Sequence, residues 1–195
     1  MTRRHGGVRL VAITTTWMAL TSCGGVPVAQ VEASLAEAKP CCSGYETVPS
    51  TELAPASRMK FEVTTSSPAF PSSEGLAYFA AFKLPASANR LEVQALYGGH
   101  LPNATYPDPL LVILDRNKRP IAEMKDLPLV RGRHVIIRGL FEYHYAATVA
   151  LPPGAEHVVV FVRPKSGRVQ SAVSDNGTLW SVPSAPIGTL AVIAS

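Results

Sequence analysis

Short segments rich in apolar and β-branched residues recur from Met59 to the C-terminus, and Pro and Gly separate them. The sequence contains 17 Pro and 14 Gly, which favours many turns and argues against long helices. Eight strands are predicted with no helix between them, at 59–64, 76–84, 90–97, 110–115, 134–141, 143–151, 157–163 and 188–194. We therefore expect an all-β domain over residues 59–195, a two-sheet β-sandwich of jelly-roll or immunoglobulin-like type.

Two segments indicate how this sandwich is built. The run from Leu110 to Leu114 is apolar throughout, which predicts a central strand covered on both faces. Pro152-Pro153-Gly154-Ala155 places Pro and Gly at the two middle positions of a type II turn. This turn predicts a hairpin between the strands on either side of it.

Residues 1–22 have the pattern of a bacterial export signal. Three Arg precede an apolar stretch of about 11 residues, well below the ~20 that a membrane-spanning helix requires. The ending Leu20-Thr21-Ser22-Cys23 is similar to a lipobox, so we expect Cys23 to be acylated and to begin the mature chain. An ordinary signal peptide is the alternative. Because Gly24 is not Asp, we expect anchoring in the outer-membrane lipid, on its periplasmic side in a Gram-negative cell, with the soluble periplasm as the alternative.

Residues 23–58 are expected to form a lipid-tethered linker. Apolar side chains recur there at helical spacing, at Val28, Val31, Leu35 and Ala38, which predicts a short helix, with a disordered linker as the alternative. The neighbouring Cys41 and Cys42 are expected to form a disulfide in an oxidising periplasm. Two unpaired thiols, or metal or redox chemistry, are the alternatives.

The net charge of +4 belongs mostly to the export signal. Without residues 1–22 the chain has 15 basic and 14 acidic side chains. Residues 116–138 nevertheless carry seven Lys or Arg against two acidic residues. Such charges usually keep sheet edges soluble, and the alternative is contact with lipopolysaccharide phosphates or an acidic protein surface. Nucleic acid is not an expected partner outside the cytoplasm.

The long connection over residues 97–109 is the best candidate for recognition, because loops on rigid scaffolds often carry function. A sugar site combines a stacking ring with a few polar groups. The candidate ligand-binding residues are His100, Asn103, Tyr106 and Asp108, with Trp180 as a second stacking residue. A purely structural crossover stiffened by proline is the alternative.

Catalytic signatures are absent from the sequence: it has no GxSxG, HExxH, phosphate-loop or calcium-loop motif. Its His residues lack metal-ligand spacing. We therefore expect no catalytic residues, no metal and no cofactor. On the segment from Phe141, aromatic and polar residues alternate, with Phe141, Tyr143 and Tyr145 on one face and Glu142 and His144 on the other.

The order of features after the signal resembles the maltose operon periplasmic protein (MalM) family. The resemblance rests on Cys41-Cys42 before Val48-Pro49, on 78–85 before 91–93, on the apolar strand 109–117 ending in Asp-x-Asn, and on 186–192. It spans most of residues 40–195 and includes no catalytic motif. It implies a secreted β-sandwich linked to maltose or maltodextrin uptake. This sequence differs from that family in its pattern similar to a lipobox at Cys23, which argues against a soluble periplasmic location.

These observations lead to three functional hypotheses. The first is a non-catalytic envelope lipoprotein accessory to carbohydrate transport, which binds a maltodextrin-type oligosaccharide or a porin. The second is a structural or protein-interaction module of the outer membrane. The third is a glycan-acting enzyme, although no pair of carboxylates can be singled out for it.

Overall fold

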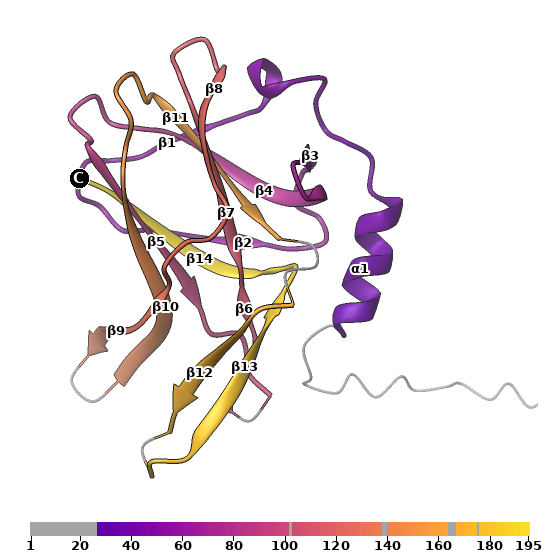
Figure 1. Cartoon of the computed structure of the whole chain (residues 1–195), viewed down its shortest axis with the longest axis vertical. Helices are drawn as coiled ribbons and strands as arrows, with labels where there is room; N and C mark the ends of the chain where they lie inside the picture. The colour runs from indigo at the N-terminus through magenta and orange to yellow at the C-terminus, as the bar shows by residue number, and fades with distance from the viewer. Residues whose placement is uncertain (1–26, 102, 138–139, 164–166, 175) are drawn as a thin grey trace, which may run out of the picture.

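A computed structural model describes residues 27–101, 103–137, 140–163, 167–174 and 176–195 (Figure 1). The helical elements are α1 (Val28–Glu37) and the short 3₁₀ turn η1 (Tyr45–Thr47). The strands are β1 (Thr51–Glu52), β2 (Met59–Val63), β3 (Ala69–Ser72), β4 (Gly75–Lys83), β5 (Arg90–Leu96), β6 (Tyr106–Pro107), β7 (Pro109–Leu114), β8 (Pro120–Met124), β9 (Val130–Ile137), β10 (Leu140–Ala150), β11 (His157–Val162), β12 (Val169–Val173), β13 (Leu179–Ala185) and β14 (Gly188–Ala194).

Two sheets face each other and form the sandwich, which confirms the predicted all-β class. The six-stranded sheet has the order β1-β4-β11-β7-β8, with β3 also paired to β4. The five-stranded sheet has the order β2-β14-β5-β10-β9. Alternate residues of the central strands bury one face of each sheet in the shared core, as Leu91 and Val93 do from β5 and Leu111 and Ile113 from β7.

The predicted central strand at 110–114 is confirmed, because every residue of β7 is buried. Its other face carries Leu110, Val112 and Leu114, which lie in a second apolar cluster on the outside of the six-stranded sheet. The chain before β1 covers this cluster with Val48 and the partly buried Tyr45, whose ring centre lies 4.9 Å from that of Phe70. Both faces of β7 are therefore removed from water.

The short helix predicted from the apolar spacing at residues 28–38 is present as α1, and it packs on the sandwich beside β4 (Figure 1). Its Val31 and Leu35 are buried in the main core, and β1 pairs in parallel with β4. The expected linker at 23–58 is therefore part of the folded body over its described residues, 27–58. None of the helices in the described part of the chain is long and apolar enough to span a membrane.

The turn at 152–155 forms as predicted, with Gly154 at φ +83° and the Ala155 N–H donating to the Pro152 carbonyl. The predicted hairpin is wrong, because β10 joins the five-stranded sheet and β11 the six-stranded sheet. The turn carries the chain from one layer to the other. Its local geometry is the same in both cases, so the sequence does not distinguish a hairpin from a crossing between sheets.

A hairpin of β12 and β13 projects from one end of the sandwich and pairs with β6 in a three-stranded sheet (Figure 1). We call this hairpin, residues 169–185, the arm. A small core joins the arm to the end of the five-stranded sheet, and it contains Tyr106, Tyr145, Ala172 and Val182. The phenol of Tyr145 donates to the Ser171 carbonyl at 3.1 Å. Burial raises the pKa of Tyr145 far above its ordinary value, so the phenol stays protonated and remains a donor.

Candidate functional site

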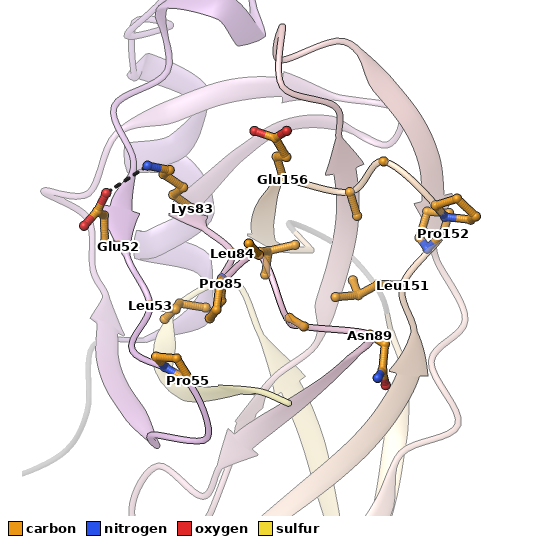
Figure 2. A pocket seen from close by; sticks show the side chains of 15 residues that line it. Glu52, Leu53, Pro55, Lys83, Leu84, Pro85, Asn89, Leu151, Pro152 and Glu156 are labelled. Carbon is orange, nitrogen blue, oxygen red and sulfur yellow. Dashed lines mark hydrogen bonds and ion pairs between the residues drawn. The ribbon is translucent and has the colours of Figure 1, made fainter.

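Two hollows formed by described residues lie at opposite ends of β10. The larger, of about 850 Å³, lies beyond the end of β10 at Leu151 (Figure 2). The smaller, of about 480 Å³, lies at the start of the same strand, around Phe141 and Tyr143. Both volumes fall within the range usual for small-molecule sites.

Loops line the larger hollow, mainly the β4–β5 and β10–β11 connections and the chain around β1. Figure 2 shows Leu84, Pro85, Leu151 and Pro152 on its walls, with an ion pair of 3.0 Å between Glu52 and Lys83 at its rim. None of the described residues that line it is aromatic. The hollow therefore lacks the ring on which a sugar stacks.

The smaller hollow is a groove between the arm and the β9–β10 hairpin. It arises because β10 extends past the part of the sandwich where the two sheets cover each other. The aromatic face of β10 leaves the core there and stays partly exposed. The lining residues are Tyr97, Gly99, His100, Leu101, Arg131, Ile136, Phe141, Glu142, Tyr143, Val173 and Ser174. We call this hollow the aromatic groove.

Aromatic rings form the floor of the groove. The rings of Tyr97 and Tyr143 are stacked with their centres 6.2 Å apart and 29° between their planes. Tyr97 also contacts the buried Tyr145 at 4.9 Å, and Tyr145 contacts Tyr106 at 5.2 Å. Since the buried rings support the partly exposed ones, the floor is fixed in place.

Two arginines of β9 lie over this aromatic face. The Arg131 guanidinium carbon lies 5.1 Å from the centre of the Tyr143 ring, and that of Arg133 lies 4.6 Å from the centre of Phe141. Arg131 also donates to the Val173 carbonyl at 2.7 Å, which links β9 to the arm. The groove therefore combines apolar ring faces with fixed cationic donors.

The wall on the side of the arm ends in a tight polar turn after β12. The Ser174 hydroxyl donates to Asn176 at 2.6 Å and accepts from the Trp180 indole N–H at 3.2 Å. Trp180 is partly buried and lies behind Ser174, outside the lining of the groove. It therefore positions a lining residue and does not itself form the stacking surface.

The structure does not bring the predicted ligand residues together. His100 lines the groove, and Asn103 is exposed on the same loop without lining it. Tyr106 and Asp108 are both 0 % exposed. With no exposed surface, neither side chain is available to a dissolved ligand, so both have a structural role in this fold.

Asp108 belongs to a buried cluster of charges at the base of the arm. Its carboxylate lies 3.9 Å from the Arg163 guanidinium and 3.5 Å from that of Arg168, which directly precedes β12. Arg163 is 7 % exposed and also lies 3.4 Å from Glu74. The Arg163 N–H donates to the Asp108 carbonyl at 2.9 Å. The cluster fixes the arm to the sandwich and so holds one wall of the groove.

The opposite face of the five-stranded sheet is polar, as the predicted alternation along β10 requires. Glu142 accepts hydrogen bonds from Arg58 at 2.6 Å and Lys60 at 2.5 Å. Burial opposes ionisation of Glu142, yet these hydrogen bonds keep its pKa below the ordinary value. His144 is 5 % exposed, and its burial lowers the pKa of the imidazole. A Cβ at Gly132 would lie 2.6 Å from the His144 Nε2 atom, so a larger residue at this position would force the imidazole to move.

The three cysteines differ in what the structure shows of them. Cys41 and Cys42 form a disulfide, the first of the three states considered for them. Cys42 packs on the outer apolar cluster, and the Cys41 N–H donates to the Ala69 carbonyl at 2.8 Å. The pair therefore holds the N-terminal segment against the six-stranded sheet. Cys23, the expected lipidation site, lies outside the described residues.

Sequence reasoning missed the grouping of Tyr97, Tyr143 and Arg131. The signal was present, because aromatic residues at 141, 143 and 145 share a face with Arg131 and Arg133 on the neighbouring strand. Finding it required the pairing of β9 with β10, which the sequence does not specify. Among the described residues, no group of three or more His, Cys, Asp or Glu side chains is placed to hold a metal ion.

Comparison with known proteins finds no matching family model, no matching curated protein and no matching solved structure.

Proposed function

We propose that this protein is a non-catalytic, lipid-anchored protein of the cell envelope that binds an oligosaccharide in the aromatic groove and is accessory to carbohydrate uptake. The observation that carries the proposal is the partly exposed pair Tyr97 and Tyr143, stacked at the floor of a 480 Å³ groove. The lipobox at Cys23 and the resemblance to maltose operon periplasmic proteins support the envelope location and the class of sugar.

The chemistry of the groove suits a neutral sugar. A pyranose ring can lie against the exposed parts of Tyr97 and Tyr143 beside the Arg131 guanidinium, and its hydroxyls can meet Arg131, His100 and the Ser174 hydroxyl around the rim. Because Arg131 is already bonded to the Val173 carbonyl, its guanidinium loses little freedom when it meets a ligand. This fixed position favours binding.

The lining favours binding over turnover. Glycoside hydrolysis normally uses two carboxylates on either side of the scissile bond. Glu142 is the one carboxylate among the described lining residues, and Arg58 and Lys60 hold it as an ion pair on the other face of the sheet. A groove with this lining is suited to recognition without cleavage.

The test is isothermal titration of the purified mature protein with maltoheptaose, and with cellopentaose as a comparison sugar. We expect binding that weakens at least about tenfold in Tyr143→Ala, a loss typical of truncating a central aromatic contact. Pro153→Ala, in the other hollow, is the matched control and should bind like the unaltered protein. If neither sugar binds, or if Pro153→Ala weakens binding as much as Tyr143→Ala, the groove is not the sugar site.

A further inference from the structure

The strand β9 is a long edge of the five-stranded sheet. Among the described residues it pairs with β10 alone, so the main-chain groups along its other side point away from the sheet. Four of its apolar side chains are more than half exposed: Val130 at 68 %, Val135 at 57 %, Ile136 at 52 % and Ile137 at 63 %. An unpaired edge of this kind is a template for another extended strand.

The other described edge strands of the sandwich are shorter and better protected. β9 has eight residues, whereas β2 and β8 have five each and β1 has two. β2 alternates apolar side chains with Lys60 and Glu62, and β8 begins with Pro120. Such residues discourage pairing. β9 instead ends in the apolar run Val135-Ile136-Ile137.

The charge on β9 is positive and has no acidic partner in the described structure. Residues 127–141 contain three Arg and no Asp or Glu. Arg131 and Arg133 lie over aromatic rings, and none of the ion pairs in the described part of the chain involves either of them. An added strand would place the Cβ atoms of its side chains about 5 Å from those of these two arginines.

A second copy of this chain fits the edge poorly. Two β9 strands related by a two-fold axis must pair antiparallel, with residues on the same face opposite each other. Centring the pair on Arg133 places Arg opposite Arg, and centring it on Gly132 places Arg131 opposite Arg133. Like charges in these two registers are destabilising. Centring the pair on His134 or Val135 avoids like charges but places Arg133 opposite an apolar side chain and leaves it without an acidic partner.

We propose that β9 accepts an extended acidic segment of another protein as an added antiparallel strand. The segment carries acidic residues opposite Arg131 and Arg133 and an apolar residue opposite Val135, beyond which the register of β9 shifts, so the pattern it must contain is apolar-x-acidic-x-acidic. Main-chain hydrogen bonds supply affinity, and the two arginines set direction and register. The two proposals share Arg131, which also lines the aromatic groove, but the added strand would pair along the open edge of β9 and neither proposal requires the other.

The probe is a labelled peptide, Val-Thr-Val-Thr-Glu-Thr-Glu, measured by fluorescence anisotropy against the purified mature protein. We expect it to bind at least tenfold more tightly than the same peptide with both Glu replaced by Lys. Arg133→Glu should reverse this preference. Arg116→Glu, in the exposed β7–β8 turn, makes the same change of net charge and should leave the preference unaltered.

A second measurement tests strand pairing on the unaltered protein, so it does not depend on the folding of a variant. Methylating alternate backbone nitrogens on the pairing side of the Glu peptide removes its donors, and we expect binding to be lost. Equal binding of the methylated peptide, or of the Glu and Lys peptides, would overturn the proposal. Equal effects of Arg133→Glu and Arg116→Glu would also overturn it. So would dimers of the protein in sedimentation velocity, because a second copy would then occupy the edge. Binding to anionic phosphatidylglycerol vesicles without peptide binding would count against it in the same way. Loss of sugar binding in Tyr143→Ala with peptide binding intact would separate the two sites.

Discussion

Two carboxylates near Arg163 allow a sharp test of whether burial or distance decides the strength of an ion pair. Asp126 lies 3.5 Å from the guanidinium and its side chain is 86 % exposed. Asp108 lies 3.9 Å away and its side chain is 0 % exposed. Distance alone would make Asp126 the stronger partner. We predict the reverse, that Asp108→Asn is far more destabilising than Asp126→Asn.

The expected magnitudes follow from the surroundings of each group. Asp108→Asn keeps the size of the side chain but leaves Arg163 and Arg168 without their shared buried carboxylate. Removing one partner of a buried ion pair costs about 3–5 kcal/mol, and we expect the lower end because Glu74 still lies 3.4 Å from Arg163. An exposed pair contributes about 0–1 kcal/mol. For a domain of this size, about 3 kcal/mol lowers Tm by roughly 6–12 °C.

The assay is thermal unfolding of both variants beside the unaltered protein, together with hydrogen exchange of the arm. Asp108→Asn should also speed exchange over β12 and β13, because Arg168 and Asp108 fix the base of the arm. Asp126→Asn should change Tm by no more than about 4 °C, and it should leave hydrogen exchange of the arm unchanged. Equal shifts of Tm in the two variants would refute the argument that burial sets the strength of this cluster.

Two further predictions concern acid stability and the lipid anchor. Burial lowers the pKa of His144 and His157 in the folded state below the ordinary 6.5, so the unfolded chain takes up protons first on acidification and stability should fall between pH 7.5 and pH 5.5. The urea midpoint should fall over this interval and fall less in His144→Gln, and a midpoint that rises on acidification would contradict the assignment. In intact cells, we expect the protein to incorporate labelled palmitate and fractionate with membranes, and Cys23→Ser to do neither. Labelling that persists in Cys23→Ser would place the lipid elsewhere.

Much of the fold could be predicted because strand formation depends on local pattern. The segments near 59–64, 76–84, 90–97, 110–115, 157–163 and 188–194 are strands in the structure, with boundaries that differ by a few residues. The turn between β9 and β10 was placed near residue 142, but β10 already begins at Leu140. The sequence has Arg138 and Gly139 between the two strands, and this Gly is a turn signal that the prediction did not use.

The arm was not predicted as strands, because its sequence is polar and interrupted. Ser, Gln and Pro occupy several positions of β12 and β13, and only Ala172, Val182 and Ala185 are buried there. These strands exist because the hairpin pairs with β6 and packs on Tyr145 and Tyr106. Without the arm, the candidate site could not be assembled from the sequence, since the arm supplies one wall.

The sequence by itself determined the all-β class, the buried β7, the alternation along β10 and the turn at Gly154, since each follows from side-chain period or from the backbone freedom of single residues. Tertiary structure alone decided that β10 and β11 belong to different sheets, that residues 27–58 pack on the sandwich, and that Tyr106 and Asp108 are buried while Tyr143 and Arg131 face a groove. The physical reason is that burial depends on which surfaces meet. Contacts between residues far apart in sequence set that outcome, and the local pattern does not encode it.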